Sequence, residues 1–523
     1  MKKTFKLMAA LLALVMVLAV FASCTSGNPT ESSTPKAESS TPAQTPAAST
    51  PSASTPDASS PNASTPAETP AQSTSQNLKD LLPPNINLDR EMKIFVGELY
   101  DEEWMDKDDG DLVGTELYNR VLRVENSLGI ELTVDKMFGD GGKRQIIIDE
   151  IKKRQQSTDP NIITDLASTY SQFAGSLTVE GVYQTINNSD NIDFDNPWWP
   201  DDLIENSTID DKVYAVSGDI SPTLIYEIYA IYYNRKLVEQ YNIPDPMELV
   251  NEHKWTLDKL IEVTSDIYED TDTTVTGPNL GDFFAFEFFD GAHYKTIPFS
   301  MGIRVIEPDA DDGYVWSELY TGQKMESILE KVVNWIQGNE GVVIPTEYNT
   351  SGSRAFLREQ AIFDLGNFGH AKGELAGSGI DYSVVPVPLF DEYQEKYLSY
   401  YGNPSSFWGI PSNVTNVDDS CALLEYLAAD AYVYISPAVF EKALKFKYVT
   451  GDVDGISKMF DIIRDGLVFD ACMLYNAEIG GYSQFSELGG TSTTWMKLFD
   501  AFKLAGMRNT IKNLVNKLRA LPY

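Results

Sequence analysis

The sequence contains few cysteines and few histidines. Its 523 residues include three of each. Three cysteines exclude a disulfide-rich scaffold and a four-cysteine zinc site. The histidines, His253, His293 and His370, lie too far apart in the sequence to indicate a histidine metal centre. We therefore predict that the protein holds no metal and no cofactor.

Basic residues are also scarce relative to acidic ones. The chain has 40 Lys and Arg against 77 Asp and Glu, a formal net charge of −37. Nucleic acids and anionic lipid surfaces are bound through basic stripes that displace counterions, so neither is an expected partner. The sequence also lacks a nucleophile elbow, a zinc-protease motif and a phosphate-binding loop. Acidic pairs are too numerous to single out a glycosidase pair. We predict a protein that is not an enzyme.

Hydrophobic residues make up 42% of the chain and aromatic residues 11%, enough for a sizeable core. Single cores stop growing at roughly 250 to 300 residues, so a chain of this length is expected to divide its core between at least two lobes.

The N-terminus carries an export signal. A lysine-rich start precedes an apolar run over residues 7–20, the length of a signal-peptide core rather than of a membrane span. The Phe-Ala-Ser-Cys sequence that ends at Cys24 resembles a bacterial lipobox, with Phe21 where Leu is usual. We predict a signal peptide over residues 1–23 and lipidation of Cys24, which would anchor the protein to the cell membrane on its extracytoplasmic face. Ordinary cleavage beside an incidental cysteine is the alternative.

A low-complexity segment follows the cysteine. Of the 52 residues from 25 to 76, 41 are Ser, Thr, Pro or Ala, and none is aromatic. Such a segment buries too little apolar surface to offset its ordering entropy. We predict a disordered tether over residues 24–85.

Beyond the tether, strand and helix patterns alternate. Residues 92–96 and 130–134 have strand patterns, and apolar residues at helical spacing lie between them and close at Gly129. A second helix pattern leads to an expected short strand over 162–165 and a loop over 165–171. Alternation of this kind predicts a largely parallel sheet that binds its ligands at the carboxyl ends of the strands. The expected fold class is α/β.

The pattern continues through the rest of the chain. Further strands are expected over 213–216, 224–234, 360–363 and 383–385, and further helices from Thr256, over 421–431 and over 495–521.

Several ordered segments resemble the extracellular solute-binding proteins of family 1, the maltose-binding-like receptors of ABC importers. The similar segments are DKVYAV at 211–216, IYYNRKL at 231–237, KWTLDKL at 254–260, FLREQAIF at 356–363 and GIP at 409–411. The resemblance extends over about four hundred residues, with Glu359 where the family usually has Gly.

The resemblance implies a two-lobed periplasmic-binding-protein-like fold of type II with a ligand cleft between the lobes. We expect lobe 1 to comprise residues 90–216 with part of 409–445, and lobe 2 to comprise 217–408 with 446–523. The lobes would close on a small-molecule solute, most simply an oligosaccharide, and the closed form would dock on the permease subunits of an ABC transporter.

Two adjacent tryptophans, Trp198 and Trp199, lie between prolines and are followed by two aspartates. Sugar rings present apolar faces that stack on aromatic planes, and carboxylates accept hydrogen bonds from hydroxyls. This combination favours a carbohydrate contact. Burial of both tryptophans in the core is the alternative, because tryptophan is highly buried on average.

Four further residues match positions where the resemblance implies ligand contacts. They are Tyr170 after a strand, Asp219 at a crossover between the lobes, Phe368 after Gly366-Asn367, and Trp408 before GIP. Asp219 could instead cap a turn. Cys421 and Cys472 could form a disulfide or remain two buried thiols.

The sequence thus favours a lipid-anchored solute receptor of an ABC importer. A surface-tethered glycoside hydrolase or lyase, and a carbohydrate sensor that serves no permease, are the alternatives.

Overall fold

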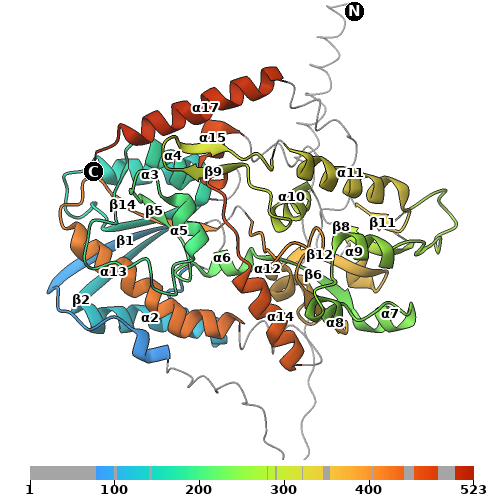
Figure 1. Ribbon diagram of the computed structural model, residues 1–523. Coiled ribbons are helices and arrows are strands. Elements are labelled where there is room, and N and C mark those ends of the chain that lie inside the picture. Colours follow the sequence, from blue (N-terminus) through green and yellow to red (C-terminus); the bar gives the residue numbers. More distant parts are fainter. Residues whose placement is uncertain are drawn as a thin grey trace, which may run out of the picture. The chain divides into compact units, whose positions relative to one another are not determined.

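The computed structural model divides the chain into two compact units, residues 1–73 and 74–523 (Figure 1). The residues it describes all lie in the second unit, over 78–98, 103–139, 144–279, 281–288, 291–320, 322–344, 354–402, 405–440, 453–480 and 501–522. Cys24 and the predicted signal peptide lie outside these ranges. No helix within them is both long and apolar enough to cross a lipid bilayer.

The first sheet has the strand order β2-β1-β3-β14-β4. Its strands are β1 (Arg90–Glu98), β2 (Ile130–Phe138), β3 (Leu166–Tyr170), β4 (Tyr183–Gln184) and β14 (Ser406–Pro411), and β5 (Ala215–Val216) also pairs with β14. β1 runs parallel to β2 and β3, whereas β14 is antiparallel to β3 and β4.

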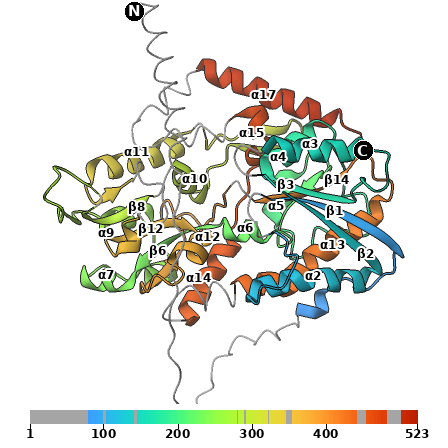
Figure 2. The same ribbon diagram turned by 180° about the vertical axis from the view of Figure 1, so that it is seen from behind.

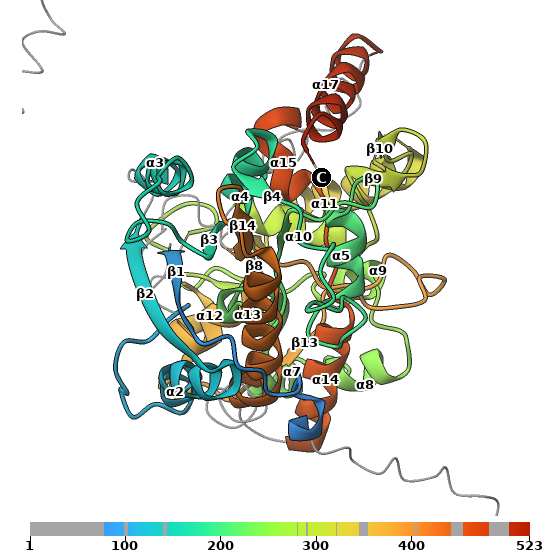
Figure 3. The ribbon, with the colours of Figure 1, turned by 90° about the vertical axis from the view of Figure 1, so that its left-hand side faces the viewer.

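Helices cover both faces of this sheet (Figures 1 and 3). α2 (Leu112–Leu128) and α13 (Val417–Asp430) pack together on one face. α3 (Arg144–Gln155) and α4 (Ser171–Val179) lie on the other. The sequence sets the ends of α2, since Asp111 accepts a hydrogen bond from the Val113 amide and Gly129 closes the helix at φ 61°.

The second sheet has the order β11-β8-β12-β6-β13. Its strands are β6 (Tyr229–Asn234), β8 (Phe283–Phe288), β11 (Val342–Val343), β12 (Ala361–Asn367) and β13 (Tyr382–Val385), and β7 (Tyr268–Glu269) pairs with β8. β8 is parallel to β11 and β12, and β6 is antiparallel to β12 and β13.

Short helices surround this second sheet, as Figure 2 shows from behind. They are α7 (Arg235–Gln240), α8 (Pro246–Asn251), α9 (Leu257–Val263), α10 (Gly291–Ser300), α11 (Gln323–Gly338), η3 (Phe356–Arg358), α12 (Phe368–His370) and η4 (Ala371–Leu375). The predicted cap of α9 is confirmed, because the Thr256 hydroxyl accepts from the Lys259 amide at 3.2 Å. A two-stranded sheet of β9 (Ile306–Asp309) and β10 (Gly313–Trp316) completes the strands of this region.

Three passages of chain connect the surroundings of the two sheets, and we call them the crossovers. They are residues 217–228, which contain α6 (Pro222–Tyr226), residues 386–405, and residues 466–471 between α14 (Val453–Asp465) and α15 (Cys472–Ile479). The crossovers are hydrogen-bonded side by side: Gly402 N donates to Glu227 O at 2.8 Å, and Ser399 N donates to Gly466 O at 2.7 Å.

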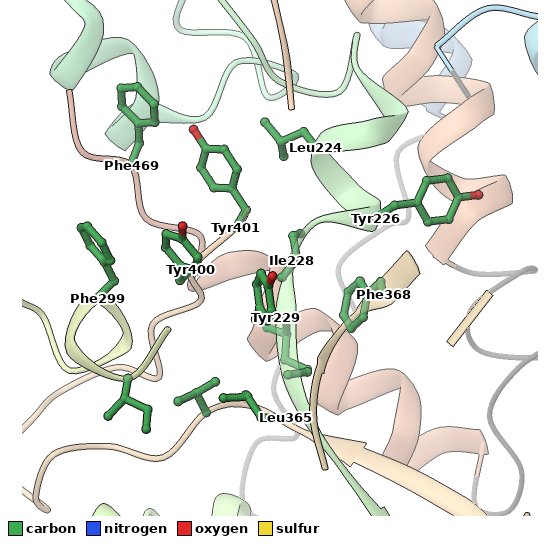
Figure 4. Close-up of a cluster of buried hydrophobic side chains, with 14 of the residues drawn as sticks. Leu224, Tyr226, Ile228, Tyr229, Phe299, Leu365, Phe368, Tyr400, Tyr401 and Phe469 are labelled. Atoms are coloured by element: carbon green, nitrogen blue, oxygen red, sulfur yellow. The ribbon is translucent and has the colours of Figure 1, made fainter. Parts of the chain in front are cut away.

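Aromatic rings pack along the crossovers (Figure 4). Phe299 stacks on Tyr400 at 5.1 Å between ring centroids, Tyr400 on Tyr401 at 6.5 Å, and Tyr401 on Phe469 at 6.1 Å. The row brings together α10 and two crossovers that lie far apart in the sequence. This aromatic row packs the two crossovers against each other and against α10.

Two expected strands are displaced. The strand expected over 162–165 lies instead at β3, residues 166–170. Most of the expected loop 165–171 is therefore strand. The expected strand 224–234 begins only at Tyr229, because Pro222 opens α6 and residues 222–226 are helical. Both errors arise because apolar runs fix neither the end of a strand nor the difference between a strand and a short helix.

The ends of the expected domains also need correction. η1 (Leu78–Leu81) falls within the range predicted for the tether and contacts η5 (Ala431–Ile435). The tail 446–523 does not all accompany the second sheet. α14 contacts β13, but α15 and α17 (Ala501–Arg519) pack on α4, beside the first sheet.

Candidate functional site

A pocket of about 290 Å³ opens at the carboxyl end of β12 in the second sheet, and we call it the edge pocket. Its walls are formed by Tyr229, His293, Arg354, Gly366, Asn367, Gly369, His370 and Glu374. β12 ends at Asn367, whose side chain accepts from the His370 amide at 3.0 Å and so starts α12 immediately. This sharp turn places the α12 and η4 side chains beside the strand end.

A charged network forms the floor of the edge pocket. The Arg354 guanidinium donates to the carboxylate of Asp364, which is fully buried in the middle of β12. His370 Nε2 lies 3.1 Å from Asp364 Oδ2, and His370 Nδ1 lies 3.0 Å from Glu374 Oε2. Burial raises the pKa of Asp364, but Arg354 and His370 outweigh it and hold that pKa below its ordinary value. The hydrogen bond from His370 likewise lowers the pKa of Glu374.

Two further titratable groups adjoin this network. Glu287 on β8 accepts hydrogen bonds from the backbone amides of Ala355 and Phe356 at 3.1 and 2.9 Å. Burial, with repulsion from Asp364, raises the pKa of Glu287 to about 7. Burial lowers the pKa of His293 to about 3, so its ring is neutral at ordinary pH. The pocket therefore presents a neutral imidazole, an amide and the partly exposed carboxylate of Glu374, while Asp364 balances the charge of Arg354.

The carboxyl edge of the first sheet carries its own row of side chains. Glu98 pairs with Phe138 across β1 and β2. Val96 pairs with Ser168, so Tyr170 lies level with Glu98, two residues further along β3. Glu98 and Tyr170 are buried, whereas Phe138 is 49% exposed. Side chains level with one another on parallel strands point to the same face, so the three form one row.

The segment after β1 adds buried charge beside this row. Thr223 of the first crossover donates to the carboxylate of Glu103, and burial raises the pKa of that carboxyl group. Arg120 on α2 donates to Ile220 O at 3.2 Å and lies 5.3 Å from the centre of the Trp104 ring. Burial lowers the pKa of Arg120 to about 10, so it stays protonated. These contacts fix the first crossover against the first sheet.

A larger pocket, of about 580 Å³, lies along the crossovers, and we call it the crossover pocket. Its lining includes residues of all three crossovers together with Trp199, Arg304, Phe440 and Arg464. None of the described parallel strands has its carboxyl end in this lining.

The main charge contact of the crossover pocket joins Asp219 to Arg464. Arg464 Nη2 lies 3.0 Å from Asp219 Oδ1, and the Ser436 hydroxyl donates to the same carboxylate. Burial raises the pKa of Asp219 in spite of this pairing. Trp199 donates from Nε1 to Glu425 Oε2 at 2.9 Å and is 1% exposed.

The structure separates the six residues that the sequence singled out. Trp199 and Asp219 both line the crossover pocket, and Tyr170 lies in the row at the first sheet's edge. Trp198, Phe368 and Trp408 are buried in the cores and line neither pocket as the described residues define them.

Each of these three buried rings contacts other side chains of the protein. Trp408 donates from Nε1 to the Ser221 hydroxyl at 3.2 Å, and Phe368 packs edge-on against Phe440 and Phe460. Trp198 lies 6.1 Å from the ring of Tyr432. For Trp198 this burial agrees with the packing alternative that its sequence context left open, and Phe368 and Trp408 are equally buried.

The sequence interpretation missed the edge pocket. Arg354, His370 and Glu374 belong to no motif, and they come together because Arg354 precedes η3 and β12 while His370 and Glu374 follow the turn that ends β12. One signal was available: the rule that ligands meet the carboxyl ends of strands, applied to the expected strand at 360–363, points to the residues directly after β12.

The structure also describes two cysteines and the grouping of the residue types that bind metals. Cys421 and Cys472, the cysteines that the structure describes, are both buried, and no disulfide joins them to each other. Cys421 belongs to the core of the first sheet and donates to Ile186 O at 3.3 Å. Within the described ranges, no three His, Cys, Asp or Glu side chains are grouped so that they could hold a metal ion.

Solved structures share this fold. The cyclic alpha-maltosyl-1,6-maltose binding protein of Arthrobacter globiformis is 13% identical with a TM-score of 0.52, over 81% of this chain and 98% of its own. The galacto-N-biose/lacto-N-biose I-binding protein of the Bifidobacterium longum ABC transporter is 11% identical with a TM-score of 0.52, over 83% and 98%. The maltose-binding periplasmic protein of Listeria monocytogenes is 14% identical with a TM-score of 0.50, over 83% and 100%.

No model of a protein family matches the chain, and no curated protein sequence does. The structural likeness confirms the predicted α/β, two-lobed, periplasmic-binding-protein-like fold.

Proposed function

We propose that this chain is an extracytoplasmic substrate-binding protein of an ABC transporter, which captures an oligosaccharide and delivers it to the permease. Cys24 would carry its lipid anchor, and the segment after it would act as the tether. The three similar structures support this reading, because their names describe sugar-binding proteins and one of them belongs to an ABC transporter.

The observation that carries the proposal is the edge pocket. Its volume of about 290 Å³ is close to the lower bound of roughly 300 Å³ for small-molecule sites. It combines an aromatic wall, Tyr229, with a carboxylate acceptor, Glu374, and with imidazole and amide groups that both donate and accept. Such a lining suits a neutral ligand rich in hydroxyl groups.

In this proposal the edge pocket supplies the second-lobe half of the binding cleft. The row of Phe138, Glu98 and Tyr170 supplies the first-lobe half, since both halves stand where parallel strands end. Closure of the lobes around a sugar would remove water from both halves. The ligand then stabilises the closed form by its higher affinity for it.

Trp199 and Asp219, which the sequence proposed as ligand contacts, have a different role in this scheme. They line the crossover pocket, where the chain passes between the lobes. We assign them to the packing and charge pairing that hold the crossovers, and we assign the ligand contact to Tyr170 and the edge pocket.

A glycoside hydrolase also uses carboxyl groups, and the pKa values of Glu287 and Asp364 are shifted in opposite directions. Glycosidases set two carboxyl groups to different pKa values on either side of the scissile bond. Glu287 and Asp364 differ in this way, but both are fully buried, and Glu287 already accepts from two backbone amides. Neither oxygen pair can reach a substrate, which favours a receptor over an enzyme.

Isothermal titration against a panel of neutral, acidic and amino-bearing oligosaccharides tests the ligand. We expect binding of a neutral oligosaccharide, with the recovered ligand unchanged after prolonged incubation. Appearance of shorter products would contradict the receptor assignment, and absence of binding to every sugar would contradict the ligand class.

Glu374→Gln tests the site. Hydrogen bonds to charged groups contribute about 1.5 to 3 kcal/mol, so affinity should fall by about tenfold or more. Glu262→Gln, a matched change of an exposed glutamate on α9, should leave affinity unchanged. A sugar that binds both variants equally would refute the edge pocket as the site while leaving the function intact.

Labelling with a fatty-acid analogue tests the anchor. Cys24→Ser should abolish the label and release the protein from the membrane fraction, whereas Cys421→Ser should keep both. Retention of the label by the Cys24 variant would refute lipidation at this residue.

A further inference from the structure

Phe138 has the largest exposed fraction, 49%, of any aromatic side chain on the described strands. Earlier residues on the same face of β2 are buried. Leu132, on the same face, is buried in the core that α2 and α13 cover, and Val134 packs partly against that core. Burial on this face of β2 therefore decreases along the strand, and the last residue, Phe138, has an exposed ring at the carboxyl edge of the sheet.

Two charged groups come from the same strand and from the segment after β1. Lys136, two residues earlier on the same face of β2, donates from Nζ to Trp104 O at 3.1 Å. The same ammonium group lies 2.9 Å from the carboxylate of Asp106, which is 68% exposed. The strand that carries the ring thus also carries a donor, Lys136, and the segment after β1 adds an exposed acceptor, Asp106.

We infer that Phe138 is a stacking platform for a ring of the sugar, with Asp106 and Lys136 receiving its hydroxyl groups. This inference rests on the proposed function and adds a residue that the sequence did not select. The apolar C–H face of a pyranose covers an aromatic plane, while its rim hydroxyls need a donor and an acceptor at the border of that plane. Phe138, Asp106 and Lys136 supply all three.

The placement favours a small ligand over a protein partner. Phe138 lies in the row with Glu98 and Tyr170, at the edge where parallel strands end and where α/β sheets bind small molecules. The other exposed apolar residues of this lobe include Tyr118 and Leu122, which lie one turn apart on α2 and not on a strand.

Four single variants test the platform by titration with the oligosaccharide that binds the wild-type protein. Phe138→Ala should weaken binding by about tenfold, the loss expected for one aromatic stacking contact. Phe138→Leu keeps an apolar side chain without a ring and should lose nearly as much, while Phe138→Tyr should retain wild-type affinity. Tyr118→Ala removes a comparably exposed ring from α2 and should change nothing.

A spectroscopic readout accompanies the affinities. Phe138→Trp should bind as the wild type does and should show a larger sugar-dependent change in tryptophan fluorescence than the wild-type protein. Equal affinity of Phe138→Ala and wild type, or a Phe138→Trp signal that does not respond to sugar, would overturn the platform while the proposed function stands. If the wild-type protein binds no carbohydrate, the proposed function itself fails. Self-association that only Phe138→Ala abolishes, measured by sedimentation, would instead assign the ring to a contact between copies.

Discussion

The buried ion pair between Arg354 and Asp364 gives a prediction about stability. The side chain of Arg354 is 4% exposed and that of Asp364 is 0% exposed, so Asp364→Asn leaves a guanidinium without its main counter-charge inside the protein. Breaking a buried pair by removing one partner costs about 3 to 5 kcal/mol. The free energy of unfolding in urea should fall by this amount, and the unfolding midpoint should fall with it.

The control is the exposed pair between Lys331 and Asp258, whose atoms lie 2.7 Å apart. Asp258 is 66% exposed, and exposed pairs contribute little, so Asp258→Asn should leave the midpoint unchanged. The assay is urea unfolding followed by circular dichroism, at one pH and one salt concentration for all variants. A double variant that replaces both Arg354 and Asp364 by apolar residues of similar volume should recover much of the loss. Equal midpoints for Asp364→Asn and Asp258→Asn would refute the reasoning, because burial would then have no effect on the cost.

Three further predictions follow from described contacts. Burial raises the pKa of Glu287 to about 7 in the folded state, so between about pH 4.5 and 7 the unfolded chain loses this proton while the folded protein keeps it. The free energy of unfolding should therefore fall as the pH rises through this range. Glu287→Gln should remove that part of the pH dependence, measured as the free energy of unfolding at several pH values. Trp408→Ala should lower stability by about 3 to 5 kcal/mol because the ring is fully buried, and a smaller loss in urea unfolding would argue against a core position. A Cβ at Gly175 would lie 2.1 Å from the Leu474 carbonyl oxygen, so Gly175→Ala should separate α4 from α15 and lower the melting temperature; an unchanged melting temperature would contradict that packing.

The sequence predicts the parts of the fold that depend on local pattern. Residues 92–96 and 130–134 lie within β1 and β2, and the αL residue Gly129 separates α2 from β2 as expected. Local pattern could not place residues 222–228, where an apolar run contains both a helical turn and the approach to β6. Tertiary packing decides there, because every residue of the run is buried whichever conformation it adopts.

The site was less predictable than the fold, for a physical reason. Tryptophan next to proline and aspartate indicates a sugar contact by composition, but composition does not reveal which side chains the rest of the protein covers. Trp198 and Trp408 are covered, and the edge pocket is lined instead by residues of ordinary type. Arg354 and Asp364 are ten residues apart in the sequence, yet only the placement of η3 before β12 turns them toward each other.

The position of β14 constrains how the chain can fold. This strand lies between β3 and β4 in the first sheet, where Ser406 pairs with Tyr170, although more than two hundred residues separate the two. During synthesis from the N-terminus, the first sheet therefore lacks an interior member until the entire second sheet has been made. Closing so long a loop is entropically costly and slow. Until β14 is made, the first half of the chain has an open sheet edge, and an open edge is the kind of surface on which another strand can pair.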